Sequence, residues 1–230
     1  MKKLAIFSLA LGDPSRYKFC LNSIAKYAEK YQLSFFLCNG QKYNFINHYF
    51  EKLQCLELLE EYDRVLCLDA DVLVTPSAKN IFEEYPDENY LYAFNENSNA
   101  EHMKRDSWID TYSPDFEWPL IDNRKMYFNS GCVLYSKPHV NLFSLISKIQ
   151  FTQKCFSIDG GEQTALNFAV AKNKIPFKSL SHSFNRMDLG EFDEQNNRYN
   201  SDFIHYAGPC KYGNGNKFQT IENDYKELYG

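Results

Sequence analysis

The order of apolar and amphipathic segments predicts an α/β protein with a Rossmann-like, mostly parallel central sheet and helices on both faces. Apolar runs at Leu4–Leu9, 33–38 and 65–68 are separated by two segments with helical spacing. Strand, helix, strand, helix, strand is the pattern of a doubly wound parallel sheet. Ligands of such sheets bind outside the carboxyl ends of the strands. The residues that follow these runs are therefore the first candidates for a binding site.

The first half of the chain contains the clearest signals for individual elements. Leu4–Leu9 is apolar enough to form a buried parallel strand. Asp13 followed by Pro14 predicts a helix start, with an N-cap acid and a proline in the first turn. A second helix is expected at 45–61. The residues expected on its inward face are Tyr49, Leu53, Leu56 and Leu59.

The second half contains further expected elements and one long irregular segment. The expected elements are a helical turn at 80–85, strands at 90–94, 126–135, 175–180 and 203–206, and helices from Pro138 and within 157–172. Residues 95–125 show no sustained period, and about thirty residues without regular structure are unusual in a compact domain. Two interpretations are open for this segment: a lid or binding loop, or a surface excursion whose aromatic residues pack inward.

Residues 62–76, YDRVLCLDADVLVTP, form the centre of the predicted site. Asp69 and Asp71 follow an apolar strand, and alternate side chains of an extended chain point to the same face. Two carboxylates there carry a large desolvation cost unless a cation neutralises them. Their oxygens suit Mg²⁺ or Mn²⁺, ions that keep open positions for substrate phosphates. The alternative is a polar strand end that caps the following turn.

A second candidate site lies in SIDGGEQTALNFAVAK, residues 157–172. Gly160 and Gly161 stand just before a predicted helix, where free N–H groups and the positive helix end favour anionic or hydroxyl groups. Asp159 and Glu162 border these glycines. The alternative is a capped helix start with an acid in its first turn.

Composition narrows the class of protein. The 230 residues are 44% apolar and 17% aromatic, which suits one globular domain. A net charge of −5 without a basic cluster argues against nucleic acid as a partner. Seven cysteines without a Cys-x-x-Cys pair predict reduced thiols and a cytoplasmic protein. The apolar run near the N-terminus is about eight residues, too short for the core of a signal peptide, and no run reaches membrane-span length.

Four motifs in order, LDADVLV, YFNSG, IDGGEQTALNF and IHYAG-PCK, resemble glycosyltransferases of the GT-A fold, specifically family 8, the glycogenin and bacterial lipopolysaccharide glycosyltransferase group. The resemblance extends over about 5–211. It implies a single GT-A (nucleotide-diphospho-sugar transferase) domain over 1–230. Within it we expect a nucleotide-binding half at about 1–75, an acceptor and donor-sugar half at about 76–211, and a polar tail at 212–230.

The resemblance implies an activity and its partners. We expect metal-dependent transfer of a hexose from a nucleotide sugar, UDP-glucose or UDP-galactose, to a hydroxyl of a glycan, lipid-linked sugar or protein acceptor. The expected cofactor is Mn²⁺ or Mg²⁺. Contact with a membrane is expected to be at most peripheral, because no basic amphipathic helix is evident.

The resemblance also assigns the metal site. It implies that Asp69, Asp71 and His205 are the metal ligands and that Lys211 contacts the diphosphate. A divalent ion there withdraws charge from the leaving nucleotide diphosphate. Neutral imidazole is an acceptable ligand for Mn²⁺, and a lysine supplies a point charge to phosphate. The chain departs from the family pattern after Lys211, where Tyr212-Gly213 replaces Pro-Trp.

Further contacts follow from the same resemblance. Residues implied in binding the nucleotide or the donor sugar are Leu9, Ala10, Tyr17, Lys52, Ala70, Asn129, Ser130, Gly131, Gly160, Gly161 and Gly208. For Lys52, a solvated helix lysine is the alternative. Asp159, Glu162 and Gln163 are implied in catalysis, with Glu162 in place of the usual aspartate. Aromatic residues that could stack on an acceptor sugar ring are Trp108, Tyr112 and Trp118.

Three alternatives remain open for the reaction. Family 8 implies retention, in which the acceptor attacks from the face of the leaving group, whereas inversion needs a carboxylate base on the opposite face. A haloacid-dehalogenase-type phosphatase also has an apolar strand that ends in Asp-x-Asp, although that strand is normally the first. A protein that binds a nucleotide sugar without turnover is the third alternative.

Overall fold

The fold is built on a six-stranded sheet. The computed structural model describes residues 2–43, 47–98, 103–112, 115–150, 161–187, 197–208 and 216–230. The strand order is β2-β1-β3-β8-β5-β9. The strands are β1 (Leu4–Leu9), β2 (Ser34–Cys38), β3 (Arg64–Asp69), β5 (Leu91–Asn95), β8 (Phe128–Ser136) and β9 (Phe177–Ser179). β1 is parallel to β2 and β3, and β5 is parallel to β9, while β8 is antiparallel to both of its neighbours. The predicted mostly parallel sheet is confirmed.

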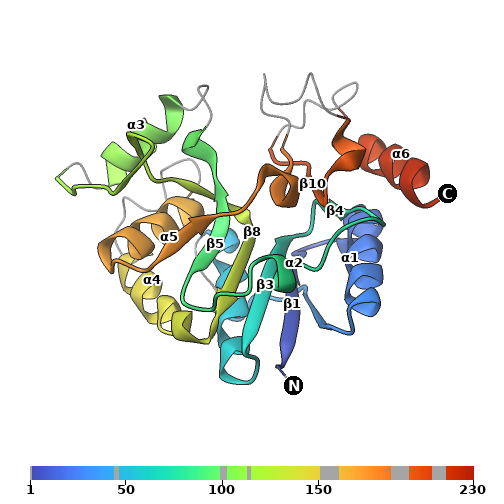
Figure 1. Cartoon of the computed structure of the whole chain (residues 1–230), viewed down its shortest axis with the longest axis horizontal. Helices are drawn as coiled ribbons and strands as arrows, with labels where there is room; N and C mark the ends of the chain where they lie inside the picture. The colour runs from blue at the N-terminus through green and yellow to red at the C-terminus, as the bar shows by residue number, and fades with distance from the viewer. Residues whose placement is uncertain are drawn as a thin grey trace.

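Helices cover both faces of this sheet (Figure 1). Ala5 and Phe7 of β1 face a core shared with η2 (His48–Glu60), α4 (Leu142–Gln150) and α5 (Gly161–Lys172). Ile6, between them, faces a second core shared with α1 (Lys18–Lys30) and α2 (Ile81–Glu84). Because both faces are buried in the middle of the sheet, β1, β3 and β5 have nearly continuous apolar runs in place of an apolar–polar alternation.

The helix expected at 45–61 is a 3₁₀ helix in the structure, η2. Its largest buried apolar side chains recur at every third position, which is the period of a 3₁₀ helix. These residues are Phe50, Leu53, Leu56 and Leu59. The expected inward position of Tyr49 is wrong, because this period turns its side chain to the surface, where it is 57% exposed.

The other predicted helix starts are confirmed with small shifts. Asp13 accepts a hydrogen bond from the Ser15 N–H at 3.0 Å and caps η1 (Pro14–Tyr17), which leads into α1. Asn80 caps α2, and η4 (Lys137–His139) precedes α4. Two further short elements in the described residues are η6 (His182–Asn185) and η8 (Arg198–Asn200).

The segment 95–125, expected to be irregular, contains several elements. They are η3 (Glu96–Ser98), α3 (Met103–Tyr112), β6 (Leu120–Ile121) and β7 (Arg124–Lys125). Trp118 is 5% exposed and packs against Phe116 and Phe168, as the inward-packing interpretation expects. Stacking of Trp118 on a sugar ring is therefore excluded, whereas Trp108 borders an open cleft.

A small second sheet and the last helix complete the fold. β4 (Val72–Val74) pairs antiparallel with β10 (Phe203–His205), and α6 (Lys217–Tyr229) packs beside them (Figure 1). Ile221 of α6 shares a buried cluster with Leu73 and Tyr206. The segment expected as a polar tail thus contains a helix that is part of the folded domain.

Two further features concern cysteines and membranes. The cysteines in the described part of the chain are free thiols, and all of them except Cys38 are buried. In the same part of the chain, no helix combines the length and the hydropathy needed to cross a bilayer.

Candidate active site

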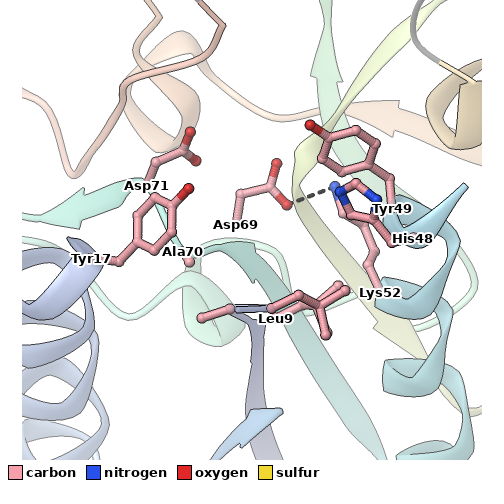
Figure 2. A pocket seen from close by; sticks show the side chains of 10 residues that line it. Leu9, Tyr17, His48, Tyr49, Lys52, Asp69, Ala70 and Asp71 are labelled. Atoms are coloured by element: carbon pink, nitrogen blue, oxygen red, sulfur yellow. Dashed lines mark ion pairs between the residues drawn. The ribbon is translucent and has the colours of Figure 1, made fainter. Parts of the chain in front are cut away.

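The carboxyl ends of β1, β2 and β3 meet at one edge of the sheet. Leu9 ends β1 and pairs in register with Asp69, which ends β3, and the Ala10 N–H donates to the carbonyl of Cys38 at 2.9 Å. The pocket above this edge has Leu9 at its base and Tyr17 on the α1 side (Figure 2). His48, Tyr49 and Lys52 of η2 form the opposite wall. The structure thus has a pocket at the strand ends where the sequence predicts a binding site.

The two aspartates converge by a different route from the one expected. The chain turns at Ala70 and Asp71, so β3 and β4 belong to different sheets instead of forming one extended strand. Ala70 is 5% exposed and packs with Ala10 and Leu21 beneath the turn. Both carboxylates therefore face the cleft because of the turn, and the argument from strand alternation is wrong for this pair.

His205 reaches the aspartates from β10. Its Nε2 lies 3.4 Å from Asp71 Oδ1 and 3.8 Å from Asp69 Oδ2. One ligand atom from each of the three residues lies within 4.8 Å of the other two. Such a spacing is compatible with a shared divalent cation, because carboxylates and imidazole are both common metal ligands.

The orientation of the His205 ring is set by Asn185. His205 Nδ1 lies 2.8 Å from Asn185 Oδ1, while Asn185 Nδ2 donates to Asn129 Oδ1 at 3.0 Å. Since the Asn185 oxygen accepts, Nδ1 bears a proton, and Nε2 is the ring nitrogen that faces the aspartates. His205 is 3% exposed, so the ring has little freedom to turn.

Lys52 is buried among acceptors rather than solvated. Its Nζ lies 2.6 Å from Asp69 Oδ1 and 3.1 Å from Glu162 Oε1, and it also donates to the hydroxyl of Ser130 at 3.3 Å. Figure 2 shows the Lys52–Asp69 pair across the pocket. Burial lowers the pKa of Lys52, but the carboxylates of Asp69 and Glu162 raise it by a larger amount. The net pKa therefore lies above the ordinary value of a lysine.

Asp71 pairs with a lysine that the sequence analysis missed. Lys217, the first residue of α6, donates to Asp71 Oδ2 at 2.5 Å. Burial raises the pKa of Asp71, yet the hydrogen bond from His205 and the charges of His205 and Lys217 lower it more, so its net pKa lies well below the ordinary value. Asp71 is therefore ionised and able to bind a cation.

The far wall of the cleft is a hydrogen-bonded network. Gln163 Oε1 accepts from the Ser130 N–H at 2.9 Å, and the Ser130 hydroxyl donates to Glu162 Oε1 at 2.8 Å. Asn129 donates to Glu96 Oε1 at 2.8 Å, and Glu96 Oε2 accepts from Arg105 at 2.7 Å. Polar side chains held in this way form a preorganised surface for hydroxyl groups.

The structure brings most of the implied residues together. Gly208, with φ of +60°, borders the cleft, Gly161 begins α5, and Gly131 leaves room for the His205 ring. Asp159, Gly160 and Lys211 lie outside the described residues.

Sequence reasoning missed several residues that border the site. They are His48, Tyr49, Glu96, Arg105, Asn185 and Lys217. Glu96 had a usable signal, because it directly follows an apolar strand much as Asp69 does. Asn216, which caps α6 through the Gln219 N–H, was a signal for the helix that begins at Lys217.

Comparison with solved structures shows which fold this is. A glycosyltransferase involved in the glycosylation of the major capsid of PBCV-1 is 15% identical and matches with a TM-score of 0.65 over 96% of this chain and 99% of that one. The galactosyltransferase LgtC, in complex with donor and acceptor sugar analogs, is 16% identical, with a TM-score of 0.54 over 98% and 96%. GlyE of Streptococcus pneumoniae TIGR4 is 14% identical, with a TM-score of 0.60 over 99% and 64%. These likenesses confirm the GT-A fold.

Comparison with curated proteins finds no match. The family model described as "Glycosyl transferase family 8" matches residues 15–212. Because this match covers most of the chain, including both aspartates and His205, the chain is a glycosyltransferase that belongs to glycosyl transferase family 8.

Proposed function

We propose that the chain transfers a hexose from a UDP-sugar, UDP-glucose or UDP-galactose, to an acceptor hydroxyl with a divalent cation, Mn²⁺ or Mg²⁺. The observation that supports this most is the convergence of Asp69, Asp71 and His205 at the carboxyl end of β3. These three residues would hold the cation. Once bound, a divalent cation stabilises negative charge on a leaving diphosphate.

The pocket beside this triad suits the nucleoside part of the donor. Leu9 and Ala10 supply backbone groups at the end of β1, and the Tyr17 ring borders the same space. In our proposal the base lies over Leu9 and Ala10 beside Tyr17. Tyr49, whose side chain is largely exposed, forms the other wall.

The hydrogen-bonded wall suits the donor sugar. Asn129, Ser130 and Gln163 present amide and hydroxyl groups that are each held by a neighbour. Lys52 holds Asp69 and Glu162 in place through its two ion pairs. We assign these residues to orientation of the hexose, since fixed polar groups cost no reorganisation during reaction.

We propose retention of anomeric configuration, which family membership supports. The acceptor hydroxyl then attacks from the face of the departing diphosphate, and its proton passes to the diphosphate. Glu162 Oε1 already accepts from Lys52 and Ser130, so that oxygen is engaged in holding the wall. Inversion through a base such as Asp159, which lies outside the described residues, is the alternative.

The acceptor is proposed to enter beside α3. The cleft of about 500 Å³ that contains the triad extends to Arg105 and Trp108. The Arg105 guanidinium lies 4.0 Å from the Trp108 ring centroid, so this edge offers N–H donors with an aromatic surface. Such a surface suits a glycan, a lipid-linked sugar or a glycosylated protein.

We propose that the reaction takes place in the cytoplasm, because the cysteines of the described residues are free thiols.

The rival activities are less well supported. The strand that ends in Asp69 is the third in the sequence, whereas the phosphatase motif normally ends the first, and the family match does not favour a phosphatase. A protein that binds a nucleotide sugar without turnover has no need of a Lewis acid at the leaving group.

Calorimetric titration of UDP, with and without Mn²⁺, tests the proposal on the wild type and on Asp71→Ala. We expect binding only in the presence of Mn²⁺ and a loss of about a hundredfold or more in Asp71→Ala, the effect of removing a metal ligand. Glu29→Ala, which removes an exposed acid on α1, is the matched control and is expected to bind as the wild type does.

The outcomes separate the alternatives. Metal-independent binding of UDP would contradict the assignment of Asp69 and Asp71 as metal ligands. Absence of UDP binding with retained GDP binding would change the donor class. A panel of UDP-sugars, with transfer followed by NMR of the product anomer, then distinguishes retention from inversion.

A further inference from the structure

Lys217 and His205 share the carboxylate of Asp71. The ammonium of Lys217 lies 2.5 Å from Oδ2, while the imidazole Nε2 lies 3.4 Å from Oδ1. Lys217 also borders the cleft that contains Asp69 and the sugar-facing wall. A cationic side chain thus stands at the edge of the proposed metal site, at the start of a helix that the resemblance to family 8 did not imply.

The two lysines of the cleft differ in how fully they are paired. Lys52, with 8% of its side chain exposed, donates to Asp69, Glu162 and Ser130, which uses its three N–H donors. Lys217, with 21% exposed, has Asp71 as its acceptor among the described residues. An ammonium has three donors, so two N–H groups of Lys217 have no acceptor in the described part of the chain and can donate to a ligand in the cleft.

Lys217 is held in place by a buried cluster around Asp224. Asp224 of α6 accepts from Arg198 at 2.6 and 2.8 Å, from Tyr199 at 2.8 Å and from Tyr206 at 2.6 Å. Tyr206 directly follows His205, so the helix that presents Lys217 is tied to the segment that presents His205. The hydroxyl of Tyr229 further ties α6 to the carbonyl of Val74 in β4 at 2.7 Å.

α6 also touches the nucleoside side of the cleft. Phe218, next to Lys217, packs edge-on against Tyr17 with ring centroids 5.6 Å apart. The beginning of α6 therefore borders both Tyr17, assigned to the base, and Asp71, assigned to the cation. The space between these two residues is where the diphosphate of a donor has to lie.

We propose that Lys217 is a ligand of the donor diphosphate, an inference that rests on the proposed function. Its ammonium lies between the Asp71 carboxylate and the phosphate oxygens and donates a charge-assisted hydrogen bond to each. Without it, the negative charges of Asp71 and of the diphosphate repel one another more strongly. Lys217 thereby favours a nucleoside diphosphate over an uncharged nucleoside.

Titrations of Lys217→Met and Lys217→Arg with UDP in the presence of Mn²⁺ test this inference. We expect UDP to bind Lys217→Met about ten- to a hundredfold more weakly than the wild type, the effect of losing one hydrogen bond between charged groups. Uridine, measured by ligand-observed NMR, is expected to bind equally to both. Lys217→Arg, which retains the charge, is expected to recover much of the UDP affinity.

Two controls distinguish diphosphate binding from a structural role. Lys226→Met removes an exposed lysine from the same helix and is expected to leave UDP binding unchanged. Electron paramagnetic resonance titration of Mn²⁺ alone is expected to show equal or tighter binding to Lys217→Met, because an ammonium no longer competes for Asp71. If Lys217→Met unfolds, Lys217→Gln replaces it.

The experiment distinguishes failure of the inference about Lys217 from failure of the proposed function. Equal UDP affinity of the wild type and Lys217→Met overturns the inference and leaves the proposed function intact. A parallel loss of Mn²⁺ or uridine affinity also overturns it, since Lys217 would then only position Asp71 or α6. A wild type that fails to bind UDP with Mn²⁺ overturns the proposed function itself, and the inference with it.

Discussion

Gly131 lies directly against the imidazole of His205. A Cβ at Gly131 would come within 2.1 Å of Cε1 of His205 and within 2.8 Å of Nδ1 and Nε2. A glycine inside a strand often marks such a close approach of another group. Because Gly131 of β8 has no side chain, the His205 ring can occupy this space and reach Asp71.

Substitution of Gly131 by alanine should displace the His205 ring. Since the ring is buried and bonded to Asn185, its movement should weaken Mn²⁺ binding by about ten- to a hundredfold, as expected when a ligand loses its orientation. The overpacking should also lower the free energy of unfolding by about 1–3 kcal/mol. Titration of Mn²⁺ and urea denaturation measure the two effects.

A double-mutant cycle with His205→Ala checks the cause. In that background, Gly131→Ala should have little further effect on Mn²⁺ affinity, because the ring that it displaces is already absent. Additive losses would show instead that Gly131 acts on the site by another route.

Asn185 should matter for the metal although it is not a ligand. Asn185→Ala removes the acceptor from Nδ1 of His205, so the ring loses its fixed tautomer and Mn²⁺ affinity should fall by about ten- to a hundredfold. Asn185→Asp keeps an acceptor at this position and should retain more of the affinity. Titration of both variants with Mn²⁺ tests this prediction. Equal losses of Mn²⁺ affinity in the two variants would contradict the argument that the acceptor at Nδ1 fixes the tautomer.

Lys52 should contribute to stability as well as to binding. Lys52→Met leaves the carboxylates of Asp69 and Glu162 without their shared counter-ion, which should lower the free energy of unfolding by about 3 kcal/mol, the low end for a buried pair because Asp69 is partly exposed. Urea denaturation measures this loss. Adding Glu162→Gln to Lys52→Met should restore part of it, and failure to do so would contradict the charge argument.

Two buried histidines should make the protein sensitive to acid. Burial and the charge of Arg64 lower the pKa of His139 from 6.5 to about 4, and burial and Arg186 lower that of His182 from 6.5 to about 4. Both pKa values are depressed in the folded state, so the unfolded chain binds protons first as the pH falls. The free energy of unfolding should therefore fall between pH 6.5 and about 4 by up to about 1.4 kcal/mol per pH unit for each histidine.

Urea denaturation across this pH range measures the effect. His139→Gln should show a smaller slope of stability against pH than the wild type. His48→Gln, which replaces an exposed histidine, is the matched control and should keep the slope of the wild type. An unchanged slope in His139→Gln would exclude this residue as a source of the acid sensitivity.

Local patterns predicted much of the fold but not the kind of every helix. The run Leu4–Leu9 matches β1 residue for residue, because a strand buried on both faces is mainly apolar, here with Ser8 as the exception. The three-residue spacing of the apolar positions in η2 is visible in the sequence, but the same spacing also fits one face of an α-helix. α3 was missed because its sequence, MKRDSWIDTY, does not place its apolar residues on one face.

The sequence by itself determined the α/β order of elements, the strand end that presents Asp69 and Asp71, and the motifs of family 8. Each of these depends on residues close together in the chain. Only the tertiary structure decided that Asn185 orients His205, that Lys52 joins Asp69 to Glu162, and that Lys217 pairs with Asp71. These contacts join segments far apart in sequence. His205 and Lys217 reach Asp71 because β4 pairs with β10 and α6 packs beside them, and Lys52 reaches Asp69 and Glu162 because η2 packs against β3 and α5. Such packing is set by the burial of shared cores and not by any local pattern.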